Sequence, residues 1–539
     1  MAETVQETGT EEKVRREAAV CGMMIAYWAE RFPTSLALRS PVADLTFGEL
    51  NARANQFVRA LRSQGVGAGD SVALMCSNRL EFPEVVVGAQ RMGVRLTAVN
   101  WHLTGEEAGY IVDDCEAKAF IADARFAGAA VGAAKVAAAA TVRLAIGGSI
   151  AGFVAYDEAC DAESAHNIED PSLGTSMLYT SGTTGRPKGV FRPPSPVETS
   201  SSLFASAAYE PGESFHLCTG PLYHAAPLGI SLRGPLAAGV GVTLMDGWDA
   251  EETLRLVEAH RITHSHMVPT MFHRLISLPE EVRRSYDVSS LRFVMHGAAP
   301  CPVAVKQAIL DWWGPIVHEY YAATEGSGTV VGPEDWLQRP GTVGKPPSPD
   351  HIRIVSSDGM PEGENPLLGS REVGTIYIKA PNSGRFVYFK NEEKTANTYD
   401  GDYFTLGDMG YLDEDGYLFL TDRSAHLIIS GGVNIYPAEV EEVLLAHPAV
   451  GDAGVIGVPN EEWGEEVRAV VELQPGVVQT DALAAELMSF CREHLARYKC
   501  PRQVDFVKEL PRHDNGKLYK TALRAQYRVA YEEAKKTRE

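Results

Sequence analysis

The alternation of strand-like and helix-like segments over residues 1–350 constrains the fold of this chain most strongly. Thr46–Gln64 carries apolar residues at helical spacing and Ser71–Cys76 has the pattern of a short buried strand, and the same pair of patterns recurs in Phe82–Gly93 and Leu96–Asn100. Such alternation is typical of a mostly parallel sheet covered by helices. Further strands are expected at Phe120–Ala124, Ser214–Thr219, Gly241–Met245, Thr263–Val268 and Leu291–His296.

The pattern changes twice toward the C-terminus. Between Asp350 and Tyr411 the apolar runs become short and are divided by Gly, Pro and Asp, which predicts a small β-rich subdomain. A final unit begins near Arg423 and mixes strand patterns with helix patterns at Pro437–His447 and Asp481–Leu495. We therefore predict an α/β chain whose large N-terminal domain has parallel-rich sheets plus the small β-rich subdomain, followed by a smaller, mobile α+β C-terminal domain.

A chain of 539 residues exceeds what one hydrophobic core usually serves, so more than one domain is expected. The expected boundaries are a flexible N-terminal tail at residues 1–20, the large domain at 21–424 with the β-rich subdomain at 350–424, and the C-terminal domain at 425–539. About 115 residues suffice for an independent C-terminal unit.

Composition and charge exclude several classes of protein. Forty-nine Lys and Arg against 71 Asp and Glu give a net charge of −22, which repels nucleic acid and anionic membranes over most of the surface. Met1–Glu17 has no apolar core segment and so is not a signal peptide. The most apolar stretches, Ala127–Ile150 and Gly229–Met245, are interrupted by charged residues and are poor membrane spans. The eight cysteines show no two-residue spacing, so reduced structural thiols and a cytoplasmic location are expected.

The loop from Tyr179 to Gly189 is the strongest chemical signal in the chain. It places hydroxyls, glycines and a lysine directly after the strand-like Thr175–Leu178. Glycines allow backbone amides to converge on an anion, hydroxyls add donors, and lysine adds positive charge, so the loop is suited to hold a polyphosphate. It does not match the G-x-x-x-x-G-K-[ST] nucleotide loop. A flexible Gly/Thr linker is the alternative interpretation.

This loop and a series of later segments, in the same order, resemble the adenylate-forming superfamily. That superfamily includes acyl-CoA synthetases, aryl-CoA ligases, luciferases and the adenylation domains of peptide synthetases, and the pattern is most similar to bacterial fatty-acyl or aryl CoA ligases. The matching segments are Pro221–His224, His296–Pro300, Tyr321–Glu325, Leu406–Asp408, Asp422–Arg423, Ser430–Pro437 and Pro511–Lys517.

The resemblance implies a nucleotide site. The loop would hold the phosphates of ATP, Tyr321 would stack on the adenine, Thr324 would contact phosphate, and Asp408 would accept hydrogen bonds from the ribose hydroxyls. Arg423 would lie near the ribose and phosphate. The loop residues concerned are Thr180, Ser181, Gly182, Thr183, Thr184, Gly185 and Lys188, and the segment lining the other side of the adenine is Gly297, Ala298 and Ala299.

The resemblance also implies catalytic roles. Glu325 would ligate Mg²⁺, which prefers hard oxygen ligands, and Lys517 would reach the acyl carboxylate and the α-phosphate. Thr184 would help to stabilise the transferring phosphate. His224 would stand at the mouth of the acyl pocket, although a buried structural histidine is the alternative. Gly431 and Gly432 would line the pantetheine tunnel of a CoA-forming enzyme.

The expected activity is therefore that of an acid–thiol ligase, an ATP-dependent carboxylate–CoA ligase that forms an acyl-adenylate and then a thioester. Its substrates would be a small carboxylic acid, ATP and coenzyme A, with Mg²⁺ as cofactor. The alternative is a stand-alone adenylating enzyme that passes the acyl group to an amine or carrier protein. No nucleic acid and no integral membrane association are expected, and the oligomeric state stays open, a homodimer being one option.

By the same analogy, small and aliphatic residues without a cation wall the acyl pocket, which favours an apolar fatty or aryl acid. Those walls are Ala225–Ile230, Met267–Met271, Gly297–Cys301 and Ala322–Val331. At the expected hinge, Ala425 stands where the superfamily usually has Asp or Lys, which leaves the balance between the two domain orientations open. His260, His264, His266 and His273 form a histidine cluster, and His260 and His264 could share a helix face if the helix extends that far. A metal site is the alternative interpretation, but the segment lacks accompanying carboxylates or thiols in a metal-binding pattern.

Overall fold

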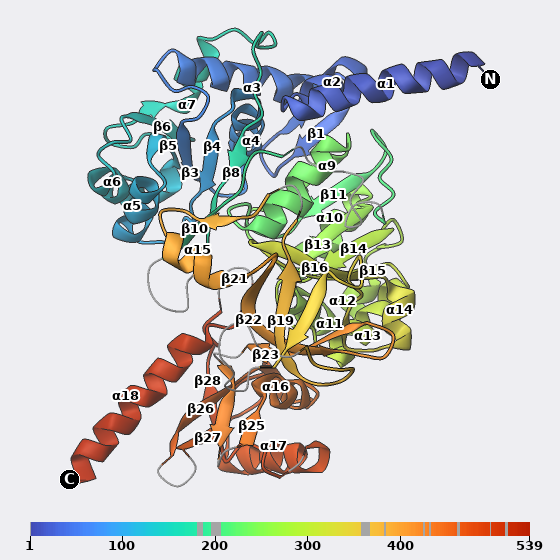
Figure 1. The fold of residues 1–539 in the computed structure, drawn as a ribbon, viewed down its shortest axis with the longest axis vertical. Coiled ribbons are helices and arrows are strands. Elements are labelled where there is room, and N and C mark those ends of the chain that lie inside the picture. The colour runs from blue at the N-terminus through green and yellow to red at the C-terminus, as the bar shows by residue number, and fades with distance from the viewer. Residues whose placement is uncertain are drawn as a thin grey trace.

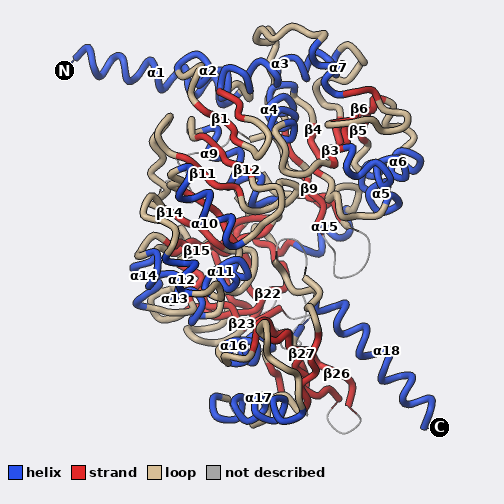
Figure 2. The backbone as a smooth tube through the Cα atoms, turned by 180° about the vertical axis from the view of Figure 1, so that it is seen from behind, coloured by secondary structure: helices blue, strands red, loops and turns tan. Residues whose placement is uncertain are grey.

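A computed structural model describes residues 2–180, 187–195, 206–356, 367–381, 384–423, 426–430, 433–460, 464–495, 497–512 and 516–538. Two parallel-rich sheets with flanking helices make up the part nearer the N-terminus, and a β-rich sheet separates them from the C-terminal domain (Figure 1). The view from behind shows the same order, with α18 (Lys520–Arg538) extending from the C-terminal domain (Figure 2). The predicted α/β fold with an additional β-rich sheet is confirmed.

The first sheet is wholly parallel, in the order β7-β6-β5-β3-β4-β8. Its strands are β3 (Ser71–Met75), β4 (Arg95–Ala98), β5 (Ala117–Asp123), β6 (Val142–Ile146), β7 (Val154–Ala155) and β8 (Thr175–Ser176). Its helices are α3 (Phe47–Arg62), α4 (Glu81–Met92), α5 (Gly105–Asp114), η1 (Ala124–Phe126), α6 (Ala127–Val136) and α7 (Tyr156–Asp161). Thr46 and Glu49 cap α3 reciprocally, which fixes the helix start that the sequence predicts.

The second sheet has the order β16-β15-β14-β13-β11-β12-β1-β2 and is parallel except at its two edges. Its strands are β1 (Leu36–Arg39), β2 (Asp44–Thr46), β11 (Phe215–Cys218), β12 (Gly241–Leu244), β13 (His264–Met267), β14 (Phe293–His296), β15 (Val317–Ala323) and β16 (Gly326–Val331). Its helices are α2 (Met24–Arg31), η2 (Pro227–Arg233), α9 (Gly234–Ala237), α10 (Ala250–His260), α11 (Pro269–Ile276), α12 (Glu280–Arg284), α13 (Val303–Trp313) and α14 (Pro333–Gln338). Parallel strands end at one edge, so the segments after β13, β14 and β15 lie close together.

A short antiparallel sheet, in the order β20-β10-β9, adjoins these layers. It consists of β9 (Leu178–Thr180), β10 (Lys188–Phe191) and β20 (Val387–Tyr388). The β-rich sheet has the order β17-β23-β22-β19-β18, with β21 paired to β22. Its elements are β17 (Thr342–Gly344), β18 (Ile352–Val355), β19 (Gly374–Lys379), α15 (Glu392–Thr398), β21 (Tyr399–Asp400), β22 (Tyr403–Leu412) and β23 (Leu418–Arg423).

The C-terminal domain packs helices α16 and α17 on a sheet in the order β25-β24-β27-β26, with β28 beside β27. Its elements are β24 (Ile428–Ser430), β25 (Val433–Ile435), α16 (Pro437–Leu445), β26 (Val450–Asn460), β27 (Gly464–Leu473), α17 (Asp481–His494) and β28 (Gln503–Val507). Antiparallel β26 and β27 bury alternate apolar residues against α16 and α17, which gives this domain a core of its own.

Two local expectations differ from the structure. The segment expected as a flexible tail forms helix α1 (Ala2–Val20), and Glu11 accepts hydrogen bonds from Tyr27 at 3.3 Å and Arg31 at 3.1 Å. The expectation that His260 and His264 could share a helix face is wrong, because α10 ends at His260 and His264 lies in β13. Arg261 adopts a left-handed conformation with φ 49°, which ends the helix between them.

Candidate active site

The predicted phosphate loop connects two paired strands. Thr180 lies opposite Lys188, and Tyr179 opposite Gly189, so β9 and β10 fix both ends of the loop. Five predicted phosphate-binding residues, Ser181, Gly182, Thr183, Thr184 and Gly185, lie outside the described residues. Tyr179 donates a hydrogen bond to Asp114 Oδ2 at 2.5 Å, which ties the first strand to helix α5.

Lys188 and Glu325 meet around one tyrosine. The Tyr388 hydroxyl donates to Glu325 Oε1 at 2.9 Å, and Lys188 Nζ lies 6.0 Å from the centroid of the Tyr388 ring. Burial, with a contribution from Lys394, lowers the pKa of Lys188. The Glu325 side chain is buried. The structure thus brings the predicted lysine and the predicted magnesium ligand to one place.

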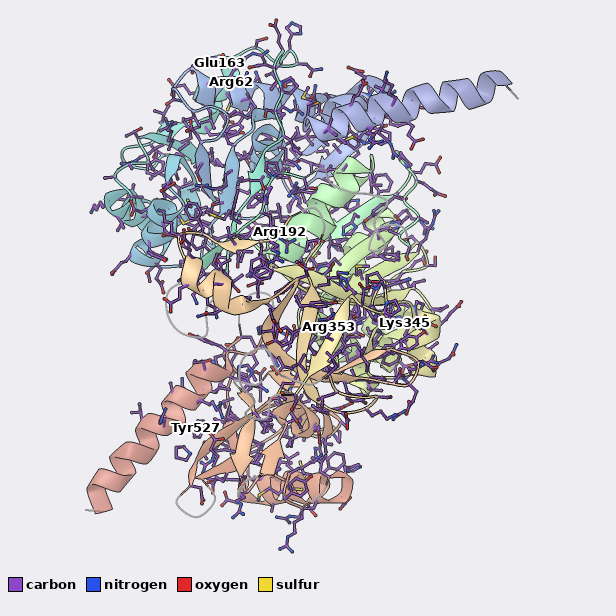
Figure 3. The ribbon with its side chains drawn as sticks, viewed as in Figure 1. Arg62, Glu163, Arg192, Lys345, Arg353 and Tyr527 are labelled. Atoms are coloured by element: carbon purple, nitrogen blue, oxygen red, sulfur yellow. The ribbon has the colours of Figure 1, made fainter. Side chains whose placement is uncertain are left out.

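Thr324 and Glu325 form the tight turn between β15 and β16, whose ends pair at Ala323 and Gly326. Arg192 donates to the backbone carbonyl of Glu325. In Figure 3 the labelled Arg192 lies where the β-rich sheet meets the parallel-rich layers. Burial lowers the pKa of the Arg192 guanidinium, and the Glu325 charge opposes that effect. A cation and a carboxylate are therefore fixed at the end of the second sheet.

The predicted adenine and ribose residues touch each other. Tyr321 donates to Asp408 Oδ2 at 2.8 Å, and both side chains are buried. Asp408 follows Gly407, which has φ 76°, and its backbone partner in β23 is Arg423. Asp408 lies within strand β22.

The segment after β14 is held in a strained conformation beside Tyr320. Ala298 has φ 70°, a left-handed value that is costly for a residue with a Cβ. A Cβ added to Gly297 would lie 2.6 Å from Tyr320 Cζ, so only glycine fits without a shift. Both features place the backbone of Gly297–Ala299 at the ends of β14 and β15, as expected for a wall of the nucleotide site.

His224 stands at the entrance to helix η2. Its amide donates to the Pro221 carbonyl at 3.1 Å, and its carbonyl accepts from the Leu228 amide at 3.0 Å. Its ring packs at 4.6 Å from the Tyr223 ring centroid. Helix η2 is π-helical, a rare geometry that is frequent at functional sites.

Gly516, the residue before Lys517, lies against the large domain. Arg512 donates to Asp452 through two bonds of 2.5 Å and to the Gly516 carbonyl at 2.6 Å. Gly516 has φ 77°, and a Cβ there would lie 2.4 Å from Thr270 Oγ1 at the start of α11. Gly516, and with it the backbone that leads into Lys517, therefore lies next to the segment that follows β13. Gly431, Gly432 and Ala425 lie outside the described residues.

Two residues at this site were not predicted. Tyr388 lies in the short strand β20. This strand is defined by its pairing with β10, where Val190 lies opposite Tyr388, and such pairing is visible only in the folded structure. Arg192 directly follows β10, so its position four residues after Lys188 is the one signal that could have indicated it.

The histidine cluster has no metal-binding arrangement. Within the described ranges, no group of three or more His, Cys, Asp or Glu side chains is placed to hold a metal ion. His264 and His266 are buried in β13, and burial lowers the pKa of each to about 4.

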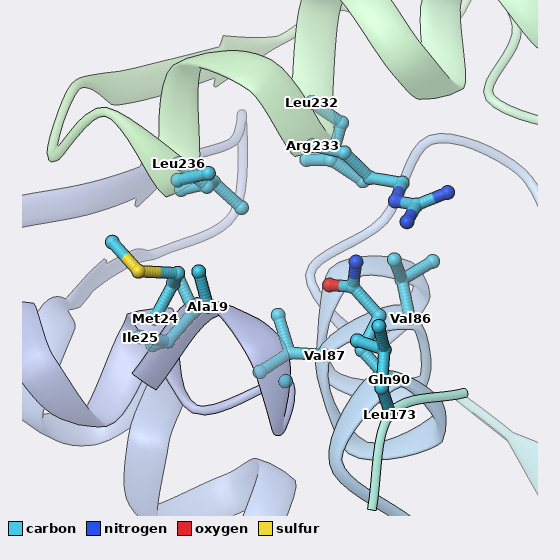
Figure 4. A pocket seen from close by; sticks show the side chains of 12 residues that line it. Ala19, Met24, Ile25, Val86, Val87, Gln90, Leu173, Leu232, Arg233 and Leu236 are labelled. Atoms are coloured by element: carbon cyan, nitrogen blue, oxygen red, sulfur yellow. The ribbon is translucent and has the colours of Figure 1, made fainter. Parts of the chain in front are cut away.

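A small cavity between α2, α4 and α9 is too small for an organic acid. Its volume is about 30 Å³, and its polar lining comes from Gln90 and Arg233 (Figure 4). When the Gln90 amide is oriented with its oxygen toward Arg233, that oxygen accepts two hydrogen bonds of 2.9 Å from the guanidinium. Ligand pockets usually exceed about 300 Å³, so this cavity is suited to one or two water molecules.

Known proteins resemble this chain along most of its length. The family described as AMP-binding enzyme matches residues 25–387, and the AMP-binding enzyme C-terminal domain matches residues 439–517. The 2-succinylbenzoate–CoA ligase of Geobacillus kaustophilus is 35% identical over 91% of this chain and 95% of its own length. The long-chain-fatty-acid–CoA ligase FadD13 of Mycobacterium tuberculosis is 30% identical over 94% of this chain and 98% of its own.

A solved structure of the anthranilate CoA ligase AuaEII with anthranoyl-AMP superposes with a TM-score of 0.84 at 25% identity, covering 95% of this chain and 98% of that one. These three proteins are acid–thiol ligases by name, as the sequence predicts for this chain. The chain belongs to the AMP-binding enzyme family, the adenylate-forming enzymes that its loop and downstream segments resemble.

Proposed function

We propose that the protein is an ATP-dependent carboxylate–CoA ligase that acts on an aryl or apolar fatty acid. The observation that carries this proposal is the convergence at one sheet edge of the Glu325–Tyr388 pair, the Tyr321–Asp408 pair and the turn that precedes Lys517. Their relative positions support a site for a nucleotide, a divalent cation and a carboxylate. The relatives are CoA ligases by name, which supports coenzyme A as the acceptor of the acyl group.

In the first step an oxygen of the acid attacks the α-phosphorus of ATP. The bond to the β-phosphate breaks, which gives the acyl-adenylate and pyrophosphate. Both reactants are anions, so the site must offset their repulsion and align them. Lys517 and Thr184 would stabilise the negative charge, while Lys188 and the rest of the phosphate loop would hold the polyphosphate.

Glu325 has the chemistry of a Mg²⁺ ligand. A buried carboxylate next to phosphate-binding groups supplies the hard oxygen that this ion prefers, so the residues present fit the ion. When bound, Mg²⁺ supplies charge neutralisation to the phosphates. The Tyr388 hydrogen bond fixes the orientation of the Glu325 carboxylate.

In the second step the thiolate of coenzyme A attacks the acyl carbon of the adenylate. The thioester forms, the mixed anhydride bond breaks and AMP leaves. His224 at the start of η2 would border the thiol's route, and Gly431 and Gly432 would line the pantetheine tunnel. The C-terminal domain would reorient between the steps and carry Lys517 away from Thr270, against which Gly516 lies.

The space beneath η2 favours an aryl acid over a long chain. Ile230, Phe293, Met295 and Tyr320 are buried together there, with Ala226 and Ala322 packed against them. These side chains close the layer between η2 and the sheet, so a long straight tail has little room behind Gly297.

A cytoplasmic location is part of the proposal. None of the eight cysteines, all of which lie in described segments, forms a disulfide, as is usual in a reducing compartment. Among the described residues no helix is both long and apolar enough to cross a membrane.

The test measures AMP, pyrophosphate and acyl-CoA over a panel of aryl and fatty acids, with and without coenzyme A. A CoA ligase forms one acyl-CoA per AMP and releases little AMP without the thiol. AMP release that depends on an added amine or carrier protein instead would establish the alternative adenylating enzyme.

The matched variants are Lys517→Ala and Lys508→Ala, which remove one lysine each from the C-terminal domain. Lys508 is exposed. We expect Lys517→Ala to slow adenylate formation at least about a hundredfold, the usual size for a lost charge-stabilising group. Equal rates for the two variants would refute the role of Lys517.

A further inference from the structure

The face of the second sheet beneath η2 carries a buried tyrosine–histidine pair. His266 Nε2 and the Tyr320 hydroxyl are hydrogen-bonded at 3.0 Å. His266 comes from β13 and Tyr320 from β15, on either side of Met295 in β14. Both side chains are buried. Tyr320 belongs to a buried cluster with Ile230, Phe293 and Met295.

One ring nitrogen on this face of the sheet lacks a hydrogen-bond partner among the described residues. His266 Nδ1 has no partner within the described structure, although its side chain is buried. His264, on the same face, makes hydrogen bonds of 2.7 Å at both ring nitrogens, to Thr263 Oγ1 and to the Ala207 carbonyl. Buried polar groups in proteins normally have partners, so the unpartnered nitrogen of His266 calls for a ligand atom.

Burial keeps the pair neutral at physiological pH. It lowers the pKa of His266 to about 4 and raises the pKa of the Tyr320 phenol. A neutral imidazole donates at one nitrogen and accepts at the other, and a phenol can do both. The pair is therefore suited to a neutral hydrogen-bonding group and poorly suited to a second carboxylate.

The pair lies directly behind the candidate active site. The Tyr320 ring touches Gly297, since a Cβ on that glycine would lie 2.6 Å from Cζ. Helix η2, which begins just after His224, packs against β11 and β13. Ile230 of η2 is buried in the same cluster as Tyr320. An acid whose carboxylate lies beside Gly297 would therefore have Tyr320 next to it and His266 directly behind.

We propose that Tyr320 and His266 form the far end of the acid pocket and select an aryl acid whose ring carries a neutral hydrogen-bonding substituent, such as a hydroxyl group. The inference rests on the ligase activity proposed above and narrows its substrate class. Ile230, Phe293 and Met295 contact the ring, while the tyrosine–histidine pair binds the substituent. A methyl group of similar size would leave both polar groups unpaired, which is how sites built for a hydroxyl reject its analogue.

The experiment compares hydroxyl- and methyl-substituted benzoates and phenylacetates, paired at each ring position, as substrates for acyl-CoA formation. The readout is the ratio of kcat/KM for the hydroxyl acid to that for its methyl partner. For at least one pair we expect the unmodified enzyme to give a ratio of about ten or more, and Tyr320→Phe to lower this ratio at least about tenfold.

Tyr209→Phe is the matched control. The Tyr209 hydroxyl is 3.2 Å from His216 Nδ1. The variant therefore removes a phenolic oxygen from a second tyrosine–histidine pair, which lies further from Gly297. We expect its ratio to stay within about twofold of that of the unmodified enzyme. A general loss of packing in Tyr320→Phe lowers kcat/KM for both acids of a pair and leaves the ratio unchanged.

Three results would overturn the inference while leaving the ligase assignment intact. The first is a kcat/KM ratio near one for every pair of acids, and the second is a ratio that Tyr320→Phe does not change. The third is a fall of the ratio in Tyr209→Phe as large as that in Tyr320→Phe. If the unmodified enzyme forms no acyl-CoA from any acid in the wider panel, the proposed function fails, and this inference fails with it.

Discussion

Two tyrosines hold the two carboxylates of the candidate site. Tyr388 donates to Glu325, and Tyr321 donates to Asp408. A buried carboxylate without a donor is costly, whereas an uncharged donor stabilises it and leaves its negative charge available to a ligand. Each carboxylate is thereby oriented before substrates arrive, which lowers the cost of binding them.

Replacement of Tyr388 by phenylalanine tests this orientation. The variant removes only the oxygen that donates to Glu325 Oε1 at 2.9 Å. With Glu325 less well oriented, we expect the Mg²⁺ concentration for half-maximal pyrophosphate release to rise and kcat/KM for ATP to fall about tenfold.

Tyr399→Phe is the control for that variant, because its hydroxyl donates to the Phe386 carbonyl at 3.0 Å in the same region. The Mg²⁺ dependence of this control should match that of the unmodified enzyme. A Tyr388→Phe enzyme with an unchanged Mg²⁺ dependence would show that the hydrogen bond does not serve metal binding.

Residue types in the segments that resemble the family indicated Tyr321, Glu325 and Asp408 as site residues, and their assigned roles stay predictions. Tyr388 could not be predicted, because its contact with Glu325 spans 63 residues and depends on the pairing of β20 with β10. The partners of a site residue come from the tertiary fold, which short segments do not encode.

At the scale of elements, β13 is a buried strand despite its two histidines. Its four residues are all buried, and the parallel partners β11 and β14 enclose it. The prediction of a strand over Thr263–Val268 is confirmed. The expectation that one helix could join His260 to His264 is wrong, because the pairing of His264–Met267 in the sheet outweighs the local helical spacing.

The buried His264 predicts a loss of stability in acid. Burial lowers its pKa from 6.5 to about 4, so the unfolded chain binds a proton that the folded protein excludes between those values. Stability is therefore complete above the unfolded pKa and falls as the pH drops toward the folded one. Between about pH 7 and about pH 4.5 the loss amounts to about 2 to 3 kcal/mol for this one group.

Urea unfolding followed by tryptophan fluorescence measures this effect. His264→Gln can keep a hydrogen bond without the titration, so we expect it to reduce the difference in unfolding free energy between the two pH values by that amount. His166→Gln, at an exposed position, should leave the difference as it is. An undiminished difference in His264→Gln would contradict the assigned cause.

At the scale of the whole molecule, described residues of the C-terminal domain contact the large domain at α11 and α13, among other places. Gly516 touches Thr270 at the start of α11, and the Val303 amide donates to Glu442 Oε1 at 3.4 Å. Most elements follow from the sequence pattern, whereas the contacts between the domains do not, since the expected hinge at Ala425 permits two orientations. Contacts between domains depend on side-chain shapes that no local pattern reports.

Gly516→Ala tests the importance of this docking. Its Cβ would lie 2.4 Å from Thr270 Oγ1, so the turn with Lys517 must move away from the large domain. We expect adenylate formation to slow at least about tenfold, and to slow more than thioester formation from supplied acyl-adenylate and coenzyme A.

Gly476→Ala controls for backbone strain. Gly476 has φ 85°, and a Cβ there meets no atom within 4 Å, so its substitution adds similar strain without a collision. If both variants slow adenylate formation equally, strain alone is responsible and the docking is unimportant.

The fate of the oxygen atoms of the acid tests the central claim most directly. When an acid labelled with oxygen-18 in its carboxylate is incubated with ATP, Mg²⁺, coenzyme A and the enzyme, attack on the α-phosphorus transfers one labelled oxygen to AMP. We predict one labelled oxygen in each AMP and one acyl-CoA for each AMP. ADP as the nucleotide product, or unlabelled AMP, would contradict the account.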